Sequence, residues 1–181
     1  MDRPTLRVGF VPGVEPDRFL RRWKSGRRAA WLELTPVPLS RQAEVLAAGE
    51  VDMCFVRLPL DAPDLHLVAL WEERAAIMIG TENVLSLLDE VTEQDLTQET
   101  EIPAAHADDA AERIAVVATG VGFTRVPLSL ARLHHRKDAV SRPLRDAEPT
   151  RIALAWPRAE DDALRQEFVG VVRGRTARSS R

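Results

Sequence analysis

The sequence predicts an α/β protein built on a parallel β-sheet, and three observations support this fold class. Short apolar segments with the character of strands alternate, over the first 58 residues, with segments whose apolar side chains recur at helical spacing. Glycine, proline or serine lies between most of these segments, as expected for turns and helix ends. Hydrophobic residues make up 45% and charged residues 29% of the 181 residues, a normal globular mixture. Such alternation favours parallel strands with helices packed on the faces of the sheet.

The first part of the chain predicts the order strand, helix, strand, helix, strand. The first apolar run, LRVGFV, ends at Pro12-Gly13, and the first helix is indicated by the spacing of Phe19, Leu20 and Trp23. Ser40 is a good N-cap for the second helix, since its hydroxyl can accept a hydrogen bond from an unpaired N–H. The predicted strands are residues 6–11, 31–35 and 51–58, and the predicted helices are residues 16–23 and the segment after Ser40.

The remainder of the chain predicts shorter elements without an internal repeat. Residues 81–100 have the composition of a short helical turn followed by an acidic loop. The further strands are predicted at residues 65–70, 75–80, 101–104, 123–126, 140–144 and 151–156, and the helices at 108–119, at 128–134 and from about residue 161.

Charge and cysteine content limit the classes of function. The formal net charge of −3 gives the whole chain no electrostatic preference for nucleic acid. One cysteine, Cys54, excludes an internal disulfide framework and is typical of a reducing compartment. No run approaches the roughly 18–20 apolar residues that cross a bilayer, and the N-terminus lacks a secretory signal. We therefore expect a cytoplasmic protein with no membrane association.

No motif indicates an enzyme, a cofactor or a metal site. The phosphate loop, the G-x-S-x-G turn and the H-E-x-x-H helix are all missing, and the four histidines are scattered. Cys54 is either a nucleophile, which requires a nearby base, or a small apolar residue of the core within VDMCFV, and we favour the core. We expect no catalytic residue, no cofactor and no metal.

Two further motifs have a functional and a structural interpretation. The basic run RRWKSGRR at residues 21–28 is either a phosphate-binding patch or the solvated end of a helix, and we favour the helix end. Gly120 and Gly122 give a G-x-G, but a dinucleotide loop follows a strand and precedes a helix. Here the helix comes first, so Gly120 is predicted to end that helix and Gly122 to begin the next strand.

Several segments, in the right order, resemble the effector-binding (substrate-binding) domain of LysR-type transcriptional regulators. They are LRVGFVPG, AEVLAAGEVDMCFVRLP, LVALWEERAAIMIGT, IAVVATGVGFTRVPLSLARL and RPLRDAEPTRIALAWPR, and together they span nearly the whole chain. The resemblance implies a two-lobed fold like that of the periplasmic type 2 binding proteins, with a small-molecule cleft between the lobes. It implies residues 1–80 and 155–181 in lobe one, residues 81–154 in lobe two, and a flexible tail from about residue 174.

The sequence departs from the family pattern in two places. A winged helix-turn-helix does not precede residue 6, so direct DNA binding is not expected of this chain. About one strand–helix unit is missing before the helix at residue 108, so the second lobe is predicted to be short. The resemblance implies a stand-alone, non-enzymatic sensor of small molecules that forms a homodimer. The alternative is an interaction module that has lost its ligand and pairs with itself or with a full-length LysR-type regulator.

Ligand-binding candidates follow from the ends of the predicted strands. In parallel sheets, ligands contact the loops at the carboxyl ends of strands, and a small carboxylate or aromatic acid is the expected effector. Ser40 either contacts the ligand or caps its helix, and Arg57 either pairs with a carboxylate or points into solvent. The candidates in lobe one are Pro12, Gly13, Val14, Ser40, Arg41, Arg57 and Pro59, to which the resemblance adds Thr124 and Pro127 of lobe two.

Overall fold

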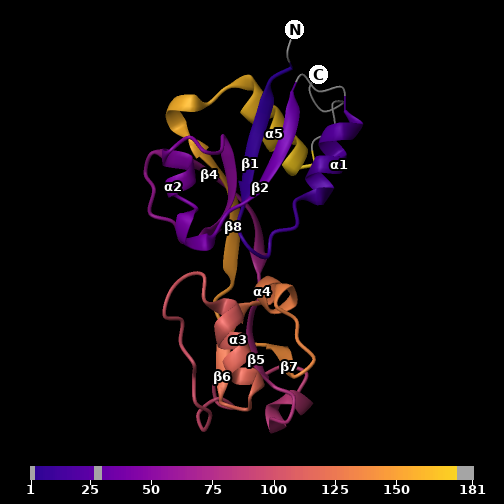
Figure 1. Cartoon of the computed structure of the whole chain (residues 1–181), viewed down its shortest axis with the longest axis vertical. Helices are drawn as coiled ribbons and strands as arrows, with labels where there is room; N and C mark the ends of the chain where they lie inside the picture. The colour runs from indigo at the N-terminus through magenta and orange to yellow at the C-terminus, as the bar shows by residue number, and fades with distance from the viewer. Residues whose placement is uncertain (1–2, 27–29, 175–181) are drawn as a thin grey trace. The chain divides into compact units, whose positions relative to one another are not determined.

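The protein, seen here as a computed structural model, is described for residues 3–26 and 30–174 (Figure 1). It divides into two compact units. Unit 1 comprises Met1–Trp71 and Ile152–Arg181, and unit 2 comprises Glu72–Arg151. Among the described residues, no helix is long and apolar enough to cross a membrane.

Unit 1 contains a five-stranded sheet with the order β2-β1-β3-β8-β4. Strand β1 is parallel to both of its neighbours, β2 and β3, as the alternation of strands and helices predicts. The last residues of β4 and the first of β8 belong to unit 2. The strands are β1 (Thr5–Phe10), β2 (Trp31–Pro36), β3 (Met53–Leu58), β4 (Leu65–Glu73) and β8 (Thr150–Pro157).

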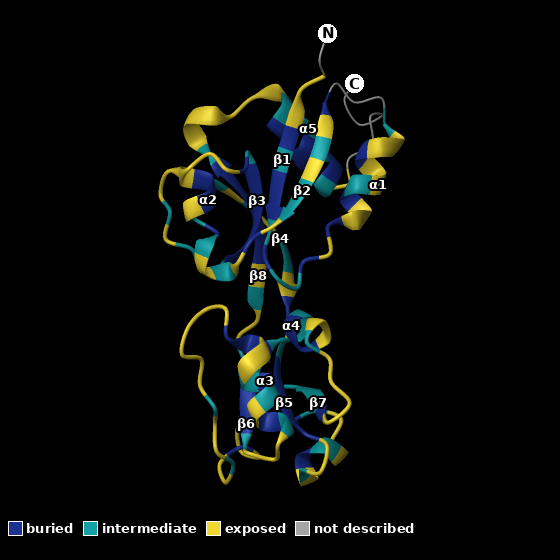
Figure 2. Cartoon of the chain, viewed as in Figure 1, coloured by how far each residue is buried: buried dark blue, intermediate teal, exposed yellow. Residues whose placement is uncertain are grey.

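Helices cover both faces of this sheet, as the buried residues in Figure 2 show. On one face, α1 (Asp17–Ser25) and α5 (Ala163–Val172) bury Phe19, Trp23 and Phe168 against the strands. On the other, α2 (Glu44–Ala47) packs on a second apolar cluster. Consecutive residues of β3 point to opposite faces of the sheet: Phe55 belongs to the first apolar cluster and Cys54 to the second. Two 3-10 turns, η1 (Leu39–Arg41) and η3 (Arg158–Glu160), complete the unit.

Unit 2 is built on a three-stranded sheet with the order β6-β5-β7. Both outer strands are antiparallel to β5, so the parallel arrangement does not extend to this unit. One face buries residues of α3 and α4 with Met78, and the opposite face packs η2 and the loop that follows it against Ile77 and Ile79. The elements are β5 (Ala75–Gly80), η2 (Val84–Leu87), α3 (Ala110–Ala118), β6 (Phe123–Pro127), α4 (Leu128–Leu133) and β7 (Ala139–Pro143).

The structure corrects three local expectations. The chain passes between the units at Trp71 and Glu72 and again at Arg151 and Ile152, whereas the sequence interpretation placed these crossings at residues 80 and 155. The reason is that β5 pairs with β6 and β7 and so belongs to unit 2. The predicted strand at residues 101–104 is reduced to a single bridge between Glu101 and Phe123. Most of the predicted flexible tail, residues 175–181, lies outside the described residues.

The predicted cap at Ser40 is also wrong. Ser40 lies within η1, and α2 begins later, after Ala43, which makes no side-chain cap. Ser40 therefore does not occupy the N-cap position of α2.

The glycine pair has the structural role predicted for it. Gly120 follows the end of α3 at a φ of +91°, and its N–H donates to the Val117 carbonyl oxygen, the arrangement of a glycine helix end. Gly122 has a φ of +59°, and a Cβ there would lie 1.8 Å from the carbonyl oxygen of Thr100. This close approach of two backbone segments, rather than a nucleotide, explains the second glycine.

Candidate functional site

The predicted ligand-binding loops of unit 1 follow neighbouring strands at the same edge of the sheet. Phe10, at the end of β1, is paired with Pro36 at the end of β2 and with Phe55 of β3. Because all three strands run in the same direction, the loops at residues 12–14, 39–41 and 57–59 leave the sheet together. Helical segments follow two of these loops, as in other α/β ligand sites. We call this region the C-terminal edge.

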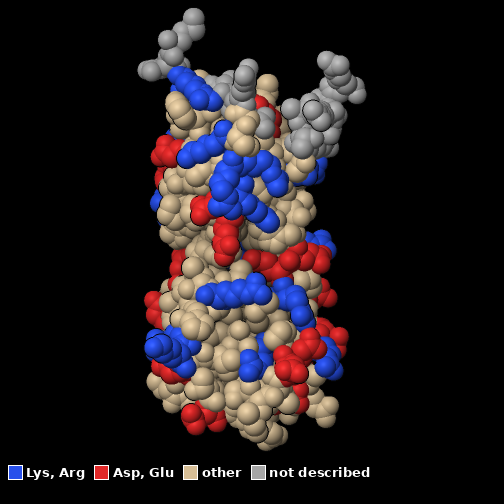
Figure 3. Space-filling model, turned by 90° about the vertical axis from the view of Figure 1, so that its right-hand side faces the viewer, with Lys and Arg blue, Asp and Glu red and all other residues tan. Residues whose placement is uncertain are grey.

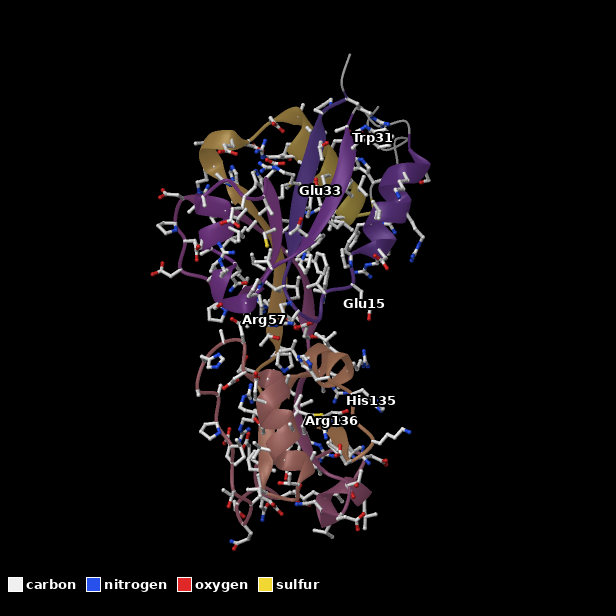
Figure 4. All side chains as sticks on the ribbon, in the orientation of Figure 1. Glu15, Trp31, Glu33, Arg57, His135 and Arg136 are labelled. Carbon is white, nitrogen blue, oxygen red and sulfur yellow. The ribbon has the colours of Figure 1, made fainter. Side chains whose placement is uncertain are left out.

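Arg57 connects two of these loops (Figure 4). Only 6% of the residue is exposed, and its Nη1 donates to the carbonyl oxygen of Pro12 over 3.1 Å. Its backbone N–H donates to Oε1 of Gln42, whose Nε2 donates back to the Arg57 carbonyl oxygen. The interpretation that Arg57 points into solvent is therefore wrong, since the residue is buried and holds the first loop against the third.

The first loop is a tight turn that enters α1. The N–H of Val14 donates to the Val11 carbonyl oxygen over 3.2 Å, and Gly13 has a φ of +89°, a backbone angle that favours glycine. Val14 itself is buried in the core of unit 1. Within this loop, therefore, backbone groups and not the Val14 side chain are available to a ligand.

In the second loop, one polar side chain, Ser40, is exposed, and another, Arg41, is held in ion pairs. Ser40 is exposed on η1. The guanidinium of Arg41 donates to Glu44 over 2.8 Å and to Glu50 over 2.7 Å, and these hydrogen bonds to carboxylates raise the pKa of Arg41 above its ordinary value. Pro59, in the third loop, is exposed after a cis peptide bond to Leu58. Of these residues, Ser40 is the polar group best placed to meet a ligand without breaking an ion pair.

In unit 2, Thr124 is fully buried, and its hydroxyl both donates and accepts a hydrogen bond. It donates to the Ile102 carbonyl oxygen over 2.8 Å and accepts from Arg113. Pro127 ends β6 and precedes the first turn of α4, where the missing N–H of a proline costs no helical hydrogen bond. Neither residue offers a side-chain polar group that is still unbonded within unit 2.

Sequence reasoning missed the buried ion pair beside Thr124. Arg113 Nε binds Asp109 Oδ1 over 2.7 Å, and its Nη1 donates to the Arg125 carbonyl oxygen. Burial opposes ionisation of Asp109, but hydrogen bonds from Arg113 and two backbone N–H groups outweigh it and hold the pKa of this carboxyl low. The i, i+4 spacing of an acidic and a basic residue on one helix is the signal that predicts this pair.

The structure leaves no reactive thiol in the described part of unit 1. Cys54 has no exposed surface, and burial raises the pKa of its thiol to about 12. This environment is typical of a structural cysteine. Within residues 3–26 and 30–174, no group of three or more histidine, cysteine, aspartate or glutamate side chains is arranged to hold a metal ion.

Comparisons with known proteins point to one family. The model of the LysR substrate binding domain matches residues 1–102. The Hca operon transcriptional activator HcaR of Escherichia coli is 21% identical over 202 residues, covering 95% of this chain and 68% of HcaR. The aligned length exceeds the 181 residues of this chain, so HcaR carries residues that this chain lacks.

Solved structures share the fold at low identity. The BenM effector binding domain with its effector benzoate superposes with a TM-score of 0.76 at 20% identity, covering 99% of this chain and 95% of that domain. A mutant regulatory domain of OxyR from Pseudomonas aeruginosa gives a TM-score of 0.71 at 18% identity, covering 96% of this chain and 98% of that domain. At these identities the similarity is one of fold.

Proposed function

The chain belongs to the LysR substrate binding domain family, and from this we propose that it is a non-enzymatic effector-binding domain whose C-terminal edge in unit 1 receives a small organic anion. The observation that carries the proposal is the buried Arg57, which places a guanidinium between the first and third loops. A guanidinium presents its N–H groups as a planar fork that matches a carboxylate. A partly desolvated cation of this kind favours an anionic ligand more strongly than a surface cation does.

The ligand class that fits best is a small carboxylate or an aromatic acid. BenM was solved with benzoate as its effector, and the chemistry of Arg57 suits the same functional group here. Ser40, exposed on the neighbouring loop, adds a hydroxyl that donates to or accepts from such a ligand. Gly13 allows the ligand to approach the backbone of the first loop closely.

A calorimetric panel of small carboxylates and aromatic acids tests the proposal. We expect at least one compound to bind, and Arg57→Lys to weaken that binding about tenfold or more, because lysine keeps the charge but loses the fork. Arg158→Lys is the matched control, since Arg158 also donates to a proline carbonyl oxygen, that of Pro63, over 3.1 Å. Binding by no member of the panel, or equal binding by both variants, contradicts the proposal.

Self-association is a second candidate function, favoured by one observation. β2 is at the edge of its sheet and carries Trp31, which is 58% exposed beneath the guanidinium of Arg3 (Figure 4). An exposed edge strand with a large apolar side chain is a surface that another chain can cover. We propose that this edge pairs two copies of the chain. Light scattering should then give the mass of a dimer for the wild type and that of a monomer for Trp31→Lys, and a monomeric wild type at high concentration contradicts it.

A further inference from the structure

A pocket of about 520 Å³ lies in unit 1 outside the three loops of the C-terminal edge. This volume is within the range of small-molecule sites. We infer that the pocket is a second ligand site, for an aromatic ring that carries two negative charges, such as an aromatic dicarboxylate. Its lining residues come from α1 (Arg18, Phe19, Arg22), from β4 (Ala69, Leu70, Trp71) and from the end of α5 and the residues after it (Val172, Arg173, Gly174).

Aromatic side chains form one wall of the pocket. The rings of Phe19 and Trp71 are nearly parallel, with 6.3 Å between their centroids, and Phe55 stacks on Phe19 from within the core. Phe19 is buried and Trp71 is half-buried, so both rings are held in place by packing. A flat aromatic ligand gains offset or edge contacts with the half-buried Trp71 ring beyond the area it buries, whereas the Phe19 ring, only 2% exposed, offers little surface.

Three arginines give the pocket a positive charge. The guanidinium of Arg18 lies 4.6 Å from the Phe19 ring centroid and 5.0 Å from that of Trp71. Arg22 Nη1 donates to the Val171 carbonyl oxygen over 2.9 Å, which anchors α1 to the end of α5. No lining residue is acidic, and among the described residues no carboxylate forms an ion pair with Arg18, Arg22 or Arg173.

Some other arginines of the protein have different partners. Arg41, Arg125 and Arg165 each bind two or more carboxylates. On the α1 face of unit 1, lysine and arginine side chains gather into one group, with acidic side chains beside and below it (Figure 3). Arg22 belongs to the basic run of residues 21–28, of which Arg27 and Arg28 lie outside the described residues. Among the described residues of this run, Arg22 is the one that lines the pocket.

Exposure of the arginines determines how many charges the ligand needs. Arg18, Arg22 and Arg173 are all exposed, and a single ion pair in such a position contributes little because water screens it. Two carboxylates on one rigid ring contact two guanidiniums at once, without the entropy cost of ordering a flexible ligand. A monoanion or a neutral ring should bind much more weakly than a rigid dianion.

Calorimetry on the full chain with four probes tests this inference. Isophthalate supplies the ring and two charges, benzoate the ring and one charge, glutarate two charges without a ring, and isophthalamide the ring without charge. We expect isophthalate to bind at least tenfold more tightly than each of the other three at this pocket. Equal affinities for isophthalate and glutarate, or for isophthalate and isophthalamide, overturn the inference.

Variants assign the binding to the pocket. Arg18→Ala and Arg173→Ala should each weaken isophthalate binding about fivefold to tenfold, because each removes a charge-assisted contact. Arg21→Ala is the matched control: Arg21 is exposed on the same helix but does not line the pocket. If Arg21→Ala reduces the affinity equally, or if neither pocket variant reduces it, the positive charge acts diffusely and the pocket is not a site.

The two proposed ligand sites use different residues, so their failures can be told apart. Arg57→Lys removes the fork at the C-terminal edge but should leave the isophthalate affinity of the pocket within twofold. Arg18→Ala should leave binding at the C-terminal edge equally unaffected. Loss of the pocket affinity in Arg57→Lys, with no loss in Arg18→Ala, assigns isophthalate to the C-terminal edge and overturns the second site while leaving the proposed function intact.

Discussion

Gln42 and Arg57 hydrogen-bond to each other in both directions. The Arg57 N–H donates to Gln42 Oε1 over 2.9 Å, and Gln42 Nε2 donates to the Arg57 carbonyl oxygen over 3.1 Å. The glutamine amide thus replaces a neighbouring strand at the end of β3, where the backbone of Arg57 is buried. This pair fixes the second and third loops of the C-terminal edge to each other, while the Arg57 guanidinium fixes the first.

Replacing Gln42 with alanine should therefore destabilise unit 1. The substitution leaves a buried N–H and a buried carbonyl oxygen of Arg57 without partners, which costs about 1–3 kcal/mol. Tryptophan fluorescence during urea unfolding measures the loss in unit 1 alone, because all four tryptophans lie there: Trp23, Trp31, Trp71 and Trp156.

Gln166→Ala is the control for this substitution. Gln166 is exposed on α5 of unit 1, so its replacement should change the free energy of unfolding of that unit by no more than about 0.5 kcal/mol. A Gln42→Ala protein as stable as the wild type would show that the reciprocal pair does not hold the loops.

Asp52 should make the stability of unit 1 depend on pH. Burial opposes its ionisation, but hydrogen bonds from the Arg7 guanidinium and backbone N–H, both at 2.7 Å, outweigh burial and lower its pKa. A lowered pKa in the folded state contributes stability above the unfolded pKa of about 3.9, and this is lost as the pH falls through the folded value. Asp52→Asn should therefore cost about 1–2 kcal/mol near neutral pH and progressively less below about pH 4.

Fluorescence-detected unfolding at a series of pH values checks this prediction. The matched control is Asp61→Asn, which alters an exposed aspartate of the same unit. A difference between the wild type and Asp52→Asn that grows as the pH falls below 4 would have the wrong sign for the proposed ion pair.

Gly122 should tolerate alanine less well than Gly120. Both have positive φ, which costs alanine about 1–2 kcal/mol, but only Gly122 also lacks space, since the Thr100 carbonyl oxygen would meet its Cβ at 1.8 Å. The Cβ would displace the Phe123 N–H from that oxygen. Circular dichroism and amide hydrogen exchange of unit 2 should show at least twice the destabilisation for Gly122→Ala, and equal losses would mean that the close approach is not maintained.

Cys54 should not react with thiol reagents in the native protein. Its side chain is inaccessible, and burial raises the pKa of the thiol to about 12, so little thiolate forms at pH 8. Cys54 is the single cysteine, so all labelling reports on this one site. Under native conditions the labelling rate should equal the rate at which the protein globally unfolds, and in denaturant the labelling should become complete. Rapid stoichiometric labelling of the folded protein would indicate an open, reactive site instead.

The sequence predicts the elements well where periodicity and turn residues agree. The spacing of Phe19 and Trp23, the run that ends at Pro12-Gly13 and the terminating Gly120 all correspond to observed elements, and the family resemblance is confirmed. Prediction from the sequence fails where pairing with a segment far away in the chain determines the structure. Residues 101–104 remain a single bridge, and β5 belongs to unit 2 because of its pairing with β6 and β7.

The adjacency of the three candidate loops was predictable from the sequence, but their contacts were not. The ends of three parallel strands place the loops of the C-terminal edge together, as the topology rule requires. Gln42 was not predicted, because a reciprocal bond across 15 residues leaves no local pattern. The pocket beside α1 was not predicted either, since α1, β4 and α5 are distant in the sequence and meet only in the folded unit.

An amide chemical-shift titration with the tightest-binding aromatic acid tests the central claim most directly. If the C-terminal edge is the effector site, the N–H signals of Gly13, Ser40 and Arg57 shift together and saturate at one affinity, and Arg57→Lys lowers that affinity about tenfold. If these signals stay unchanged while the protein binds the acid elsewhere, or if Arg57→Lys leaves the affinity unchanged, the C-terminal edge is not the effector site.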